Sequence, residues 1–239
     1  MRTGLVSISF RKLDPASIIE LCAKAQLGQI EWGGDVHVPP CDIDRAVRTA
    51  EMSLSHGIRP VGYGSYYNAS DSIDAFMPNL EAACALGAKY VRIWAGKSSS
   101  FDANAAENIR LAVKAGAERG IKVSLECHRG TMTEDRFLAV KIAEATGCLL
   151  HYQPNPDISF EENLEALRIS RPHLCACHVF AWDKGNVRLP LREHRAQWIE
   201  YVREAGDVPL LLEFVEGDSE DNLLRDAEEL KCIISMSGV

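Results

Sequence analysis

The sequence predicts a closed parallel (β/α)8 barrel, and three observations support this fold class. Short apolar runs alternate with amphipathic helical runs along the whole chain. Each pair of runs takes about 30 residues, as repeated strand-helix units do. With 239 residues, the chain has the length at which one barrel closes, so we expect a single barrel domain over residues 1–239. The alternative, a doubly wound open sheet, lacks a Gly-x-Gly-x-x-Gly turn or a phosphate loop to support it.

The boundaries of the expected elements follow from apolar runs and from residues that start and stop helices. Strands are expected at 5–9, 29–32, 58–63, 90–94, 122–127, 149–153, 174–180 and 210–214. Helices are expected to begin at 14, 42 and 159, to end at 87, and to cover 102–119, 133–146 and 218–234. Asp14 before Pro15, and Ser159 three residues before Glu162, are typical of helix starts. Glycine is typical of helix ends.

Composition and charge exclude several classes of partner. The formal net charge is −8, and no run of Lys and Arg is long enough to follow a phosphate backbone, so we do not expect nucleic acid as a partner. No apolar stretch approaches the roughly 20 residues of a membrane helix, and no secretion signal is evident. We therefore expect a cytoplasmic protein. Its eight cysteines are expected to be reduced and buried in apolar segments, without a zinc-ribbon spacing.

Polar side chains occur where the expected strands end, which is where the active site of such a barrel lies. Alternate residues of a strand point inward, so residue parity identifies the inward-facing set. Glu126 ends a strand whose outward residues are apolar, and Glu213 is the single acid of the last strand. By the same alternation Glu31, Gln153 and His178 point inward. We expect these side chains to converge at one end of the barrel.

A divalent cation would balance the negative charge of these residues. Burying several carboxylates in one cavity is costly unless positive charge lies between them. Glu126, Gln153, His178 and Glu213 offer an oxygen-rich ligand set with one imidazole, which suits manganese, magnesium or cobalt and is also compatible with zinc. Taken singly, each residue has a structural interpretation, such as an acid paired with an arginine or a hydrogen-bonded core histidine. Four such residues on consecutive expected strands favour one shared metal site over four separate structural roles.

At these residues the chain resembles the xylose isomerase-like barrel superfamily of sugar and sugar-phosphate isomerases and epimerases. The matching segments are Ile-Glu-Trp-Gly-Gly-Asp at 30–35, Val-Ser-Leu-Glu at 123–126, Cys-His-Val at 177–179 and Leu-Glu-Phe at 212–214. The resemblance implies that Glu126, Gln153, His178 and Glu213 bind one divalent metal, and that both glutamates move protons. Gln153 departs from the family pattern, which has an acid there. We expect this neutral amide to weaken metal binding.

The resemblance also implies a reaction and an outer set of residues. A proton would be removed beside a metal-polarised carbonyl, and the resulting cis-enediolate would be reprotonated at the same carbon, as in epimerisation, or at its neighbour, as in isomerisation. Glu126 and Glu213 would act from opposite sides of the substrate, and which one acts first stays open. The candidates for substrate binding are Glu31, His37, Trp94, His128, Arg129, Lys184 and Arg188. The last two lie where barrels often bind phosphate.

Other functions stay open at this stage. A metal-dependent dehydratase or lyase acting on a keto-sugar or keto-inositol needs the same proton removal. A nuclease similar to the apurinic endonucleases would need further histidines and acids for three zincs, and we do not find that cluster. A non-catalytic barrel that binds a sugar is a third alternative, because fold does not prove function. The expected partner is a small carbohydrate or related keto compound, without nucleic acid or a membrane. A homo-oligomer, the metal and the phosphorylation of the substrate are left open.

Overall fold

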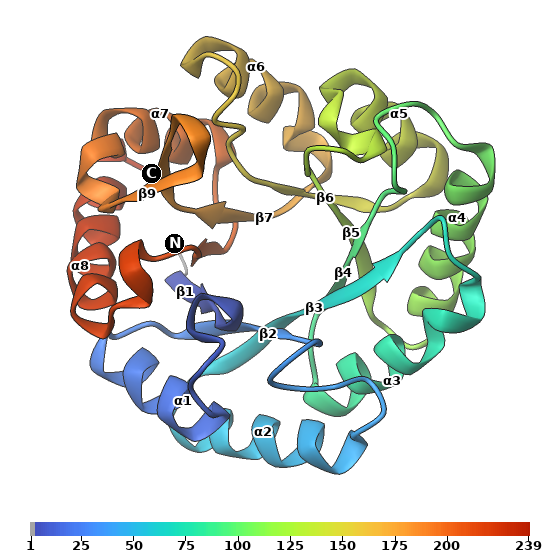
Figure 1. Ribbon diagram of the computed structural model, residues 1–239, viewed down its shortest axis with the longest axis horizontal. Coiled ribbons are helices and arrows are strands. Elements are labelled where there is room, and N and C mark those ends of the chain that lie inside the picture. Colours follow the sequence, from blue (N-terminus) through green and yellow to red (C-terminus); the bar gives the residue numbers. More distant parts are fainter. Residues whose placement is uncertain (1–2) are drawn as a thin grey trace.

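The computed structural model describes residues 3–239 and closes eight parallel strands into a barrel, with helices around the outside (Figure 1). The barrel strands are β1 (Thr3–Val6), β2 (Gln29–Gly33), β3 (Arg59–Asn68), β4 (Tyr90–Trp94), β5 (Lys122–Glu126), β6 (Leu149–Tyr152), β7 (Leu174–Val179) and β10 (Leu210–Leu212). They follow one another around the barrel in chain order, and β10 pairs with β1 to close it. The fold predicted from the sequence is confirmed.

The helices return the chain between consecutive strands. They are α1 (Pro15–Lys24), α2 (Ile43–Ser55), α3 (Met77–Leu86), α4 (Ala103–Glu118), α5 (Arg136–Thr146), α6 (Phe160–Ser170), α7 (Arg195–Ala205) and α8 (Glu220–Ser237). Their starts confirm the capping signals of the sequence. The Asp14 carboxylate accepts the Ser17 N–H, and Ser159 and Glu162 form a complete capping box.

One element was missed by sequence analysis. After β7 the chain forms an antiparallel hairpin of β8 (Ala181–Asp183) and β9 (Val187–Leu189). Each strand has only three residues, so neither carries enough alternation to be predicted. The strand expected at 210–214 is therefore β10, and the hairpin lies where the chain leaves the barrel. We call this end, at which the carboxyl termini of the strands lie, the mouth.

Several expected boundaries are wrong. The last strand ends at Leu212 instead of residue 214, and the last helix covers Glu220–Ser237 instead of 218–234. The first strand ends at Val6, because the chain turns into a 3-10 helix (Ser7–Phe10) at the mouth. β3 extends to Asn68 instead of ending at residue 63, with an irregular register against β4. α5 begins at Arg136, since Asp135 caps it and a separate 3-10 turn (Met132–Glu134) precedes it. The cysteines are free, as expected, but Cys41 and Cys232 are exposed, which corrects the expectation that all are buried.

The barrel interior is filled in layers. Val6, Val61, Tyr90, Ala176 and Leu211 form a small apolar cluster separate from the large core between strands and helices. Two residues further along their strands, Tyr90, Ala176 and Leu211 are followed by inward-facing polar side chains. The apolar layer therefore seals the barrel below a polar layer that lies nearer the mouth.

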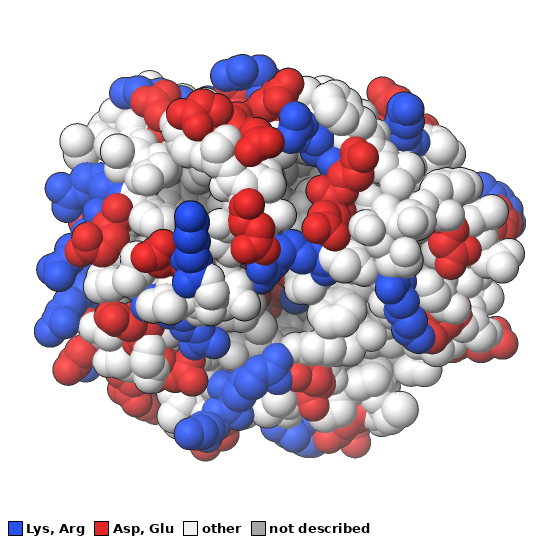
Figure 2. Space-filling model, turned by 45° about the horizontal axis from the view of Figure 1, so that its top comes forward, with Lys and Arg blue, Asp and Glu red and all other residues white. Residues whose placement is uncertain are grey.

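The outer surface carries mixed charge. On the face shown in Figure 2, Lys and Arg side chains are interspersed with Asp and Glu, and neither sign forms an extended patch. Within residues 3–239, no helix combines the length and the apolar character needed to cross a membrane.

A buried acid on α8 predicts how stability varies with pH. Asp226 is largely buried and accepts the Leu191 N–H at 2.9 Å. Burial raises the pKa of the Asp226 carboxyl to about 6, although the Leu191 hydrogen bond opposes this. Because the folded-state pKa lies above the unfolded value, the contribution of Asp226 to stability is complete below about pH 4 and is lost as the pH rises through 6. Asp226→Asn should therefore stabilise the protein at pH 7.5, by at most about 3 kcal/mol.

Urea unfolding of wild type and Asp226→Asn at pH 4 and pH 7.5 measures this difference. The matched control is Glu118→Gln at an exposed position of α4, which should leave the free energy of unfolding nearly unchanged at both pH values. An Asp226→Asn gain of equal size at pH 4 would contradict a titration effect.

Candidate functional site

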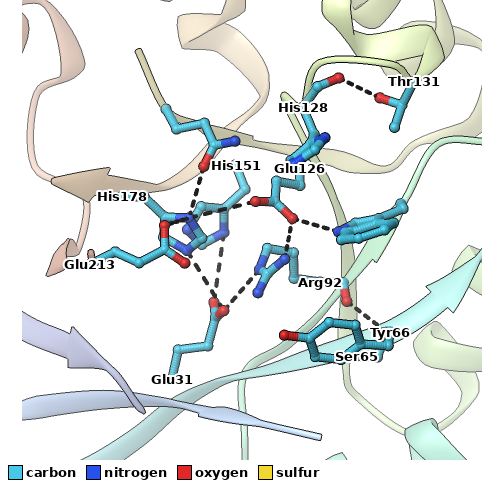
Figure 3. Close-up of polar contacts among 12 residues, drawn as sticks. Glu31, Ser65, Tyr66, Arg92, Glu126, His128, Thr131, His151, His178 and Glu213 are labelled. Carbon is cyan, nitrogen blue, oxygen red and sulfur yellow. Dashed lines mark hydrogen bonds and ion pairs between the residues drawn. The ribbon is translucent and has the colours of Figure 1, made fainter. Parts of the chain in front are cut away.

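The polar layer brings together six charged or ionisable side chains from six parts of the barrel. They are Glu31 on β2, Arg92 on β4, Glu126 on β5, His151 on β6, His178 on β7 and Glu213 directly after β10 (Figure 3). None is more than 4 % exposed. Charged groups are buried to this extent only when they are paired or bind an ion.

The guanidinium of Arg92 bridges two of the carboxylates. Its Nε donates to Glu31 Oε1 at 2.8 Å, and its Nη1 donates to Glu126 Oε2. The remaining oxygen of Glu31 accepts the Tyr90 hydroxyl at 2.9 Å, and Glu126 Oε2 also accepts the Trp94 indole N–H at 2.7 Å. Both oxygens of Glu31 and one oxygen of Glu126 are therefore engaged, and Glu126 Oε1 is left toward the mouth.

Two glycines of β3 make room for this arrangement. A Cβ at Gly62 would lie 2.3 Å from atoms of the Tyr90 ring. A Cβ at Gly64 would lie 2.7 Å from Arg92 Nη2 and 2.8 Å from Glu31 Oε1. A side chain at position 62 would thus collide with Tyr90, and one at position 64 with the Arg92–Glu31 pair. Glycine at both positions leaves the space that these residues occupy.

The charges of the layer follow from these contacts. Burial alone would raise the pKa of the Glu31 carboxyl, but Arg92 and then His178 hold it well below its usual value. Burial lowers the pKa of Arg92, but Glu126 and Glu31 raise it well above its usual value. Burial, with the neighbouring His178, lowers the pKa of His151 far enough to keep that ring neutral. Arg92 is thus a permanent cation in the centre of the barrel.

His178 lies between two sets of possible ligands. On the mouth side, its Nδ1 is 3.1 Å from Glu213 Oε2, 3.4 Å from Gln153 Oε1 and 4.0 Å from Glu126 Oε1. Three oxygens of the residues expected from the sequence to share a metal therefore lie within 4.0 Å of His178 Nδ1.

The opposite side of His178 faces a second set. Glu31, His151 and His178 offer three ligand atoms within 4.8 Å of one another, and all three residues are fully buried. His178 Nε2 is 3.6 Å from Glu31 Oε1, and His151 Nδ1 is 4.0 Å from Glu31 Oε2. A group that could hold a metal ion is therefore present, and the two sets share His178. We call Glu126, Gln153, His178 and Glu213 the mouth set, and Glu31, His151 and His178 the inner set. Both oxygens of Glu31 already accept hydrogen bonds, so the inner set has fewer free donor atoms for a metal ion than the mouth set.

The protonation of His178 reflects the surrounding acids. Burial lowers its pKa, but Glu213 and then Glu31 more than offset this and raise it to about 10. Without another cation, His178 is thus protonated at neutral pH. A metal bound at Nδ1 would replace that proton as the positive charge next to Glu213.

Several buried polar atoms of this layer have no hydrogen-bond partner among the described residues. They include Glu213 Oε2, His178 Nε2 and both ring nitrogens of His151. Orphaned groups are rare in protein interiors and are explained by a functional role or by a bound water or ion. The orphaned Glu213 oxygen lies in the mouth set.

Trp94 and His128 form one wall of the mouth. Their rings stack with centroids 5.2 Å apart and planes 20° apart. His128 Nδ1 lies 2.6 Å from the carbonyl oxygen of Arg129. Because a carbonyl can only accept, Nδ1 carries the hydrogen, and a neutral His128 therefore presents Nε2 as an acceptor.

The other predicted binding residues are held in different ways. Arg129 pairs with Asp157 at 2.6 Å and donates to Asn186 at 2.8 Å. Lys184 is exposed in the turn between β8 and β9. Arg188 on β9 pairs with Asp218 at 2.6 Å.

His37 is placed away from the polar layer. It is buried beside Trp32, with the rings 6.0 Å apart, and its Nδ1 lies 2.9 Å from Ser7 Oγ. Ser7 Oγ also accepts the Gly33 N–H at 2.8 Å. These contacts hold the end of β2 in place at Gly33, two residues after Glu31.

Sequence reasoning did not assign Arg92, Tyr90 or His151 to the site. The sequence carried a signal for two of them. Tyr90, Arg92 and Trp94 are every second residue of β4, so they share one face of that strand, as Ser124 and Glu126 do on β5. Parity alone, however, does not say whether an inward arginine binds a ligand or balances an acid.

Comparison with solved structures identifies the fold more closely. The probable 3-DHS dehydratase AsbF from Bacillus anthracis, involved in petrobactin synthesis, is similar over 97 % of this chain and 99 % of its own, with a TM-score of 0.78 and 17 % identity. A xylose isomerase domain protein from Alicyclobacillus acidocaldarius is similar over the full length of both chains, with a TM-score of 0.76 and 15 % identity. This chain has the xylose isomerase-like TIM barrel fold.

An L-ribulose 3-epimerase has the same fold, with a TM-score of 0.71 and 16 % identity over 99 % of this chain and 94 % of its own. No protein-family model matches the sequence, and no curated protein matches it significantly. At these identities the likeness establishes the fold.

The buried Arg92 predicts a large effect on stability. Arg92→Met should lower the free energy of unfolding by about 3–5 kcal/mol, because Glu31 and Glu126 would be left buried without their common partner. The matched control is Arg110→Met on α4, where an exposed arginine pairs with Glu107. That change should leave the free energy of unfolding nearly unchanged, because water screens an exposed ion pair. Urea unfolding measures both, and an Arg92→Met protein as stable as wild type would contradict the bridging role.

Proposed function

We propose that this barrel binds one divalent cation through Glu126, Gln153, His178 and Glu213 and catalyses isomerisation or epimerisation of a carbohydrate or related keto compound. The observation that carries the proposal is the convergence of three oxygens from different strand ends on His178 Nδ1, at 3.1 to 4.0 Å. The similar structures named as an epimerase and a dehydratase support a carbohydrate-related enzyme of this kind.

The spacing of the donor atoms supports an ion at the mouth set. Donors about 2.1 Å from a six-coordinate ion lie about 3.0 Å apart when adjacent and about 4.2 Å apart when opposite. The distances from His178 Nδ1 to Glu213, Gln153 and Glu126 fall in this interval. The orphaned Glu213 Oε2 is also the kind of atom that a bound cation would satisfy.

The charge of the layer supports a dication in particular. Three carboxylates, Glu31, Glu126 and Glu213, lie together with one permanent cation, Arg92. A dication with a neutral His178 would balance the remaining negative charge. An acid at position 153 would add a further negative charge, so the neutral amide of Gln153 is consistent with a barrel in which Arg92 is already present. Manganese, magnesium and cobalt suit this oxygen-rich set.

The chain's own residues divide the chemistry between them. The bound cation would polarise a substrate carbonyl and thereby acidify the adjacent C–H. Arg92 and Trp94 fix Glu126 through Oε2, and Oε1 lies 4.0 Å from His178 Nδ1. Glu213 Oε2, which faces His178 Nδ1 at 3.1 Å, would bind the cation, and the other oxygen of the Glu213 carboxylate would take a proton from the substrate carbon. Glu126 on β5 would have to carry a proton of its own to protonate the substrate, so that a turnover ends with Glu213 protonated and Glu126 ionised. Glu31 would hold the His178 ring in place from the inner side.

A metal-dependent dehydratase is the second candidate. Elimination of water needs a group that protonates the leaving hydroxyl, in addition to the base that removes the C–H proton. His128, oriented by the Arg129 carbonyl and stacked on Trp94, could supply this proton only when Nε2 is also protonated. The similarity to a dehydratase gives this candidate further support.

Titration calorimetry with Mn²⁺, followed by exchange in deuterated water, tests the proposal. The protein should bind one equivalent of Mn²⁺ and then exchange the α-hydrogen of ketoses or keto-cyclitols, as seen by NMR. Glu213→Gln should reduce the exchange rate by about 100-fold or more, because a positioned acid-base group contributes that much. Glu220→Gln, an exposed acid at the start of α8, should leave the rate unchanged. Metal binding without exchange of any probe would refute the enzymatic assignment, and no binding of any divalent cation would refute the metal site.

Gln153 provides a separate test of the ligand set. Gln153→Glu should tighten Mn²⁺ binding by about tenfold, because ligand charge tunes affinity. The same change should lower the stability of the metal-free protein, since it adds an acid to a negative cluster. Asn104→Asp, at an exposed position of α4, adds the same charge away from the mouth and should change neither property. Unchanged Mn²⁺ affinity in Gln153→Glu would exclude this side chain from the coordination sphere.

A further inference from the structure

The hollow beside Gln153 is narrow. Gln153, His128 and Arg129 line it together with Trp182 of the β8–β9 hairpin. Water-sized spheres can occupy only about 80 Å³ of this space. One water molecule needs about 10–15 Å³ of such space, so the hollow admits a few waters but not a carbohydrate. A larger ligand can therefore approach Gln153 from here only when part of the lining moves.

The β8–β9 hairpin is a part of this lining that lies outside the barrel sheet. Its two strands form a sheet of their own, separate from the eight barrel strands. All residues of Asp183–Val187 are exposed. A hairpin of two strands is marginally stable by itself, so its position depends on its contacts with neighbouring segments.

Both ends of the hairpin are held in place. Phe180, directly before β8, accepts the indole N–H of the buried Trp198 on its carbonyl at 2.8 Å. Leu191, which follows shortly after β9, is buried and donates its N–H to a carboxylate of α8 at 2.9 Å. Arg188 on β9 pairs with Asp218 at 2.6 Å. The turn between β8 and β9 is therefore the part of the hairpin that is left to move.

One hydrogen bond ties this turn to the rest of the mouth. Asn186 Oδ1 accepts an N–H from Arg129 Nη2 at 2.8 Å. Within residues 3–239, no other hydrogen bond joins Asp183–Val187 to a segment outside the hairpin. Asn186 has φ of 62°, and Gly185 before it has φ of 74°. Glycine and asparagine are the residues that adopt this left-handed conformation most readily, so the turn itself is unstrained.

Arg129 connects the turn to a second loop. Its Nη1 donates to Asp157 Oδ2 at 2.6 Å, in the loop between β6 and α6. The guanidinium therefore joins three segments of the mouth, which follow β5, β6 and β7. The planar fork of donors on an arginine suits this double contact, whereas a lysine would not hold both partners in fixed directions.

The loop between β6 and α6 is a rigid support. Pro154 and Pro156 fix two of its φ angles. The side chain of the buried Asn163 accepts the Asn155 N–H at 2.8 Å and donates to the Asn155 carbonyl at 2.9 Å. Arg129 thus ties a movable turn to a fixed loop.

We propose that Arg129 is a positioning residue that latches the β8–β9 hairpin over the hollow, and that the hairpin is a gate to the mouth. In the latched form Asn186 is bound to Arg129, and Trp182 narrows the hollow. When this hydrogen bond breaks, the turn swings outward about its held ends and Trp182 moves with it, so that the space beside Gln153 widens. The inference goes beyond the proposed function, because it concerns access to the mouth and not the chemistry there.

The latch can be weakened or strengthened without a change of fold. Arg129→Met removes both contacts at a partly exposed position. Asn186→Asp replaces a neutral acceptor with a carboxylate, and a charge-assisted hydrogen bond is about twice as strong as a neutral one. Aspartate also tolerates the left-handed conformation of position 186.

Hydroxyl-radical footprinting of the full chain, mapped by peptide mass spectrometry, measures the exposure of Trp182. Arg129→Met should raise the oxidation rate of Trp182 by about threefold or more, and Asn186→Asp should lower it by about twofold. Trp198, which is 1 % exposed, should stay protected in every variant and thereby show that the barrel is intact. The matched control is Arg168→Met, which breaks an ion pair between α6 and α7 and should leave the oxidation of Trp182 unchanged.

Chemical labelling of His128 measures entry into the hollow. The probe is diethyl pyrocarbonate, which is about the size of a pentose and modifies unprotonated imidazole. Its rate of reaction with His128, taken relative to the exposed His56, should be about fivefold higher in Arg129→Met than in wild type, because the reagent reaches the ring only when the gate is open. Arg168→Met should leave this ratio unchanged.

A double variant establishes whether the two residues of the latch act together. Asn186→Asp should have no effect on Trp182 when Arg129→Met is already present. Unchanged Trp182 oxidation in Arg129→Met, or slower oxidation by Asn186→Asp that persists without Arg129, would overturn the latch. Faster Trp182 oxidation without faster His128 labelling would overturn the gate. Neither measurement needs a metal or a substrate, so failure of the protein to bind Mn²⁺ would refute the proposed metal centre and leave this inference intact.

Discussion

The ion pairs of Arg92 with Glu31 and Glu126 are the constraint on which the polar layer depends. Three carboxylates lie in the interior of this barrel, and one guanidinium between two of them makes that burial tolerable. The pairing fixes the rotation of both acids and leaves one oxygen of Glu126 toward the mouth. The space for it comes from β3, where Gly62 and Gly64 carry no side chains. The sequence of four adjacent strands, β2 to β5, thus encodes a charge balance as well as a set of possible ligands.

The layer separates into an inner and an outer part that meet at His178. Its inner nitrogen faces Glu31, which Arg92 and Tyr90 hold in place, and its outer nitrogen faces Glu213, Gln153 and Glu126. Carboxylates behind a ligating imidazole orient the ring and strengthen it as a ligand. In this arrangement Glu31 orients the His178 ring. The arrangement also explains why the most deeply buried acid of the barrel need not contact a substrate.

The barrel and most of the outer part of the site were predictable from the sequence. Alternation on the strands is a local property, so it identified Glu126, His178 and Glu213 as inward-facing, and the cap residues located the helix starts. The role of Arg92 was not predictable in the same way. Which acids an inward arginine reaches depends on the stagger between neighbouring strands, which no single strand encodes. The β8–β9 hairpin and the left-handed Phe214 were missed because their conformations are imposed by tertiary packing. Local patterns therefore do not reveal how the rings of Phe180, Trp182 and Phe214 come together at the mouth.

The metal centre is tested most directly by anomalous diffraction from crystals of the protein grown with Mn²⁺. The account predicts one strong anomalous peak, about 2 Å from His178 Nδ1 and from oxygens of Glu126, Gln153 and Glu213. A peak enclosed by Glu31, His151 and the opposite nitrogen of His178, or the absence of any peak at the mouth, would contradict it.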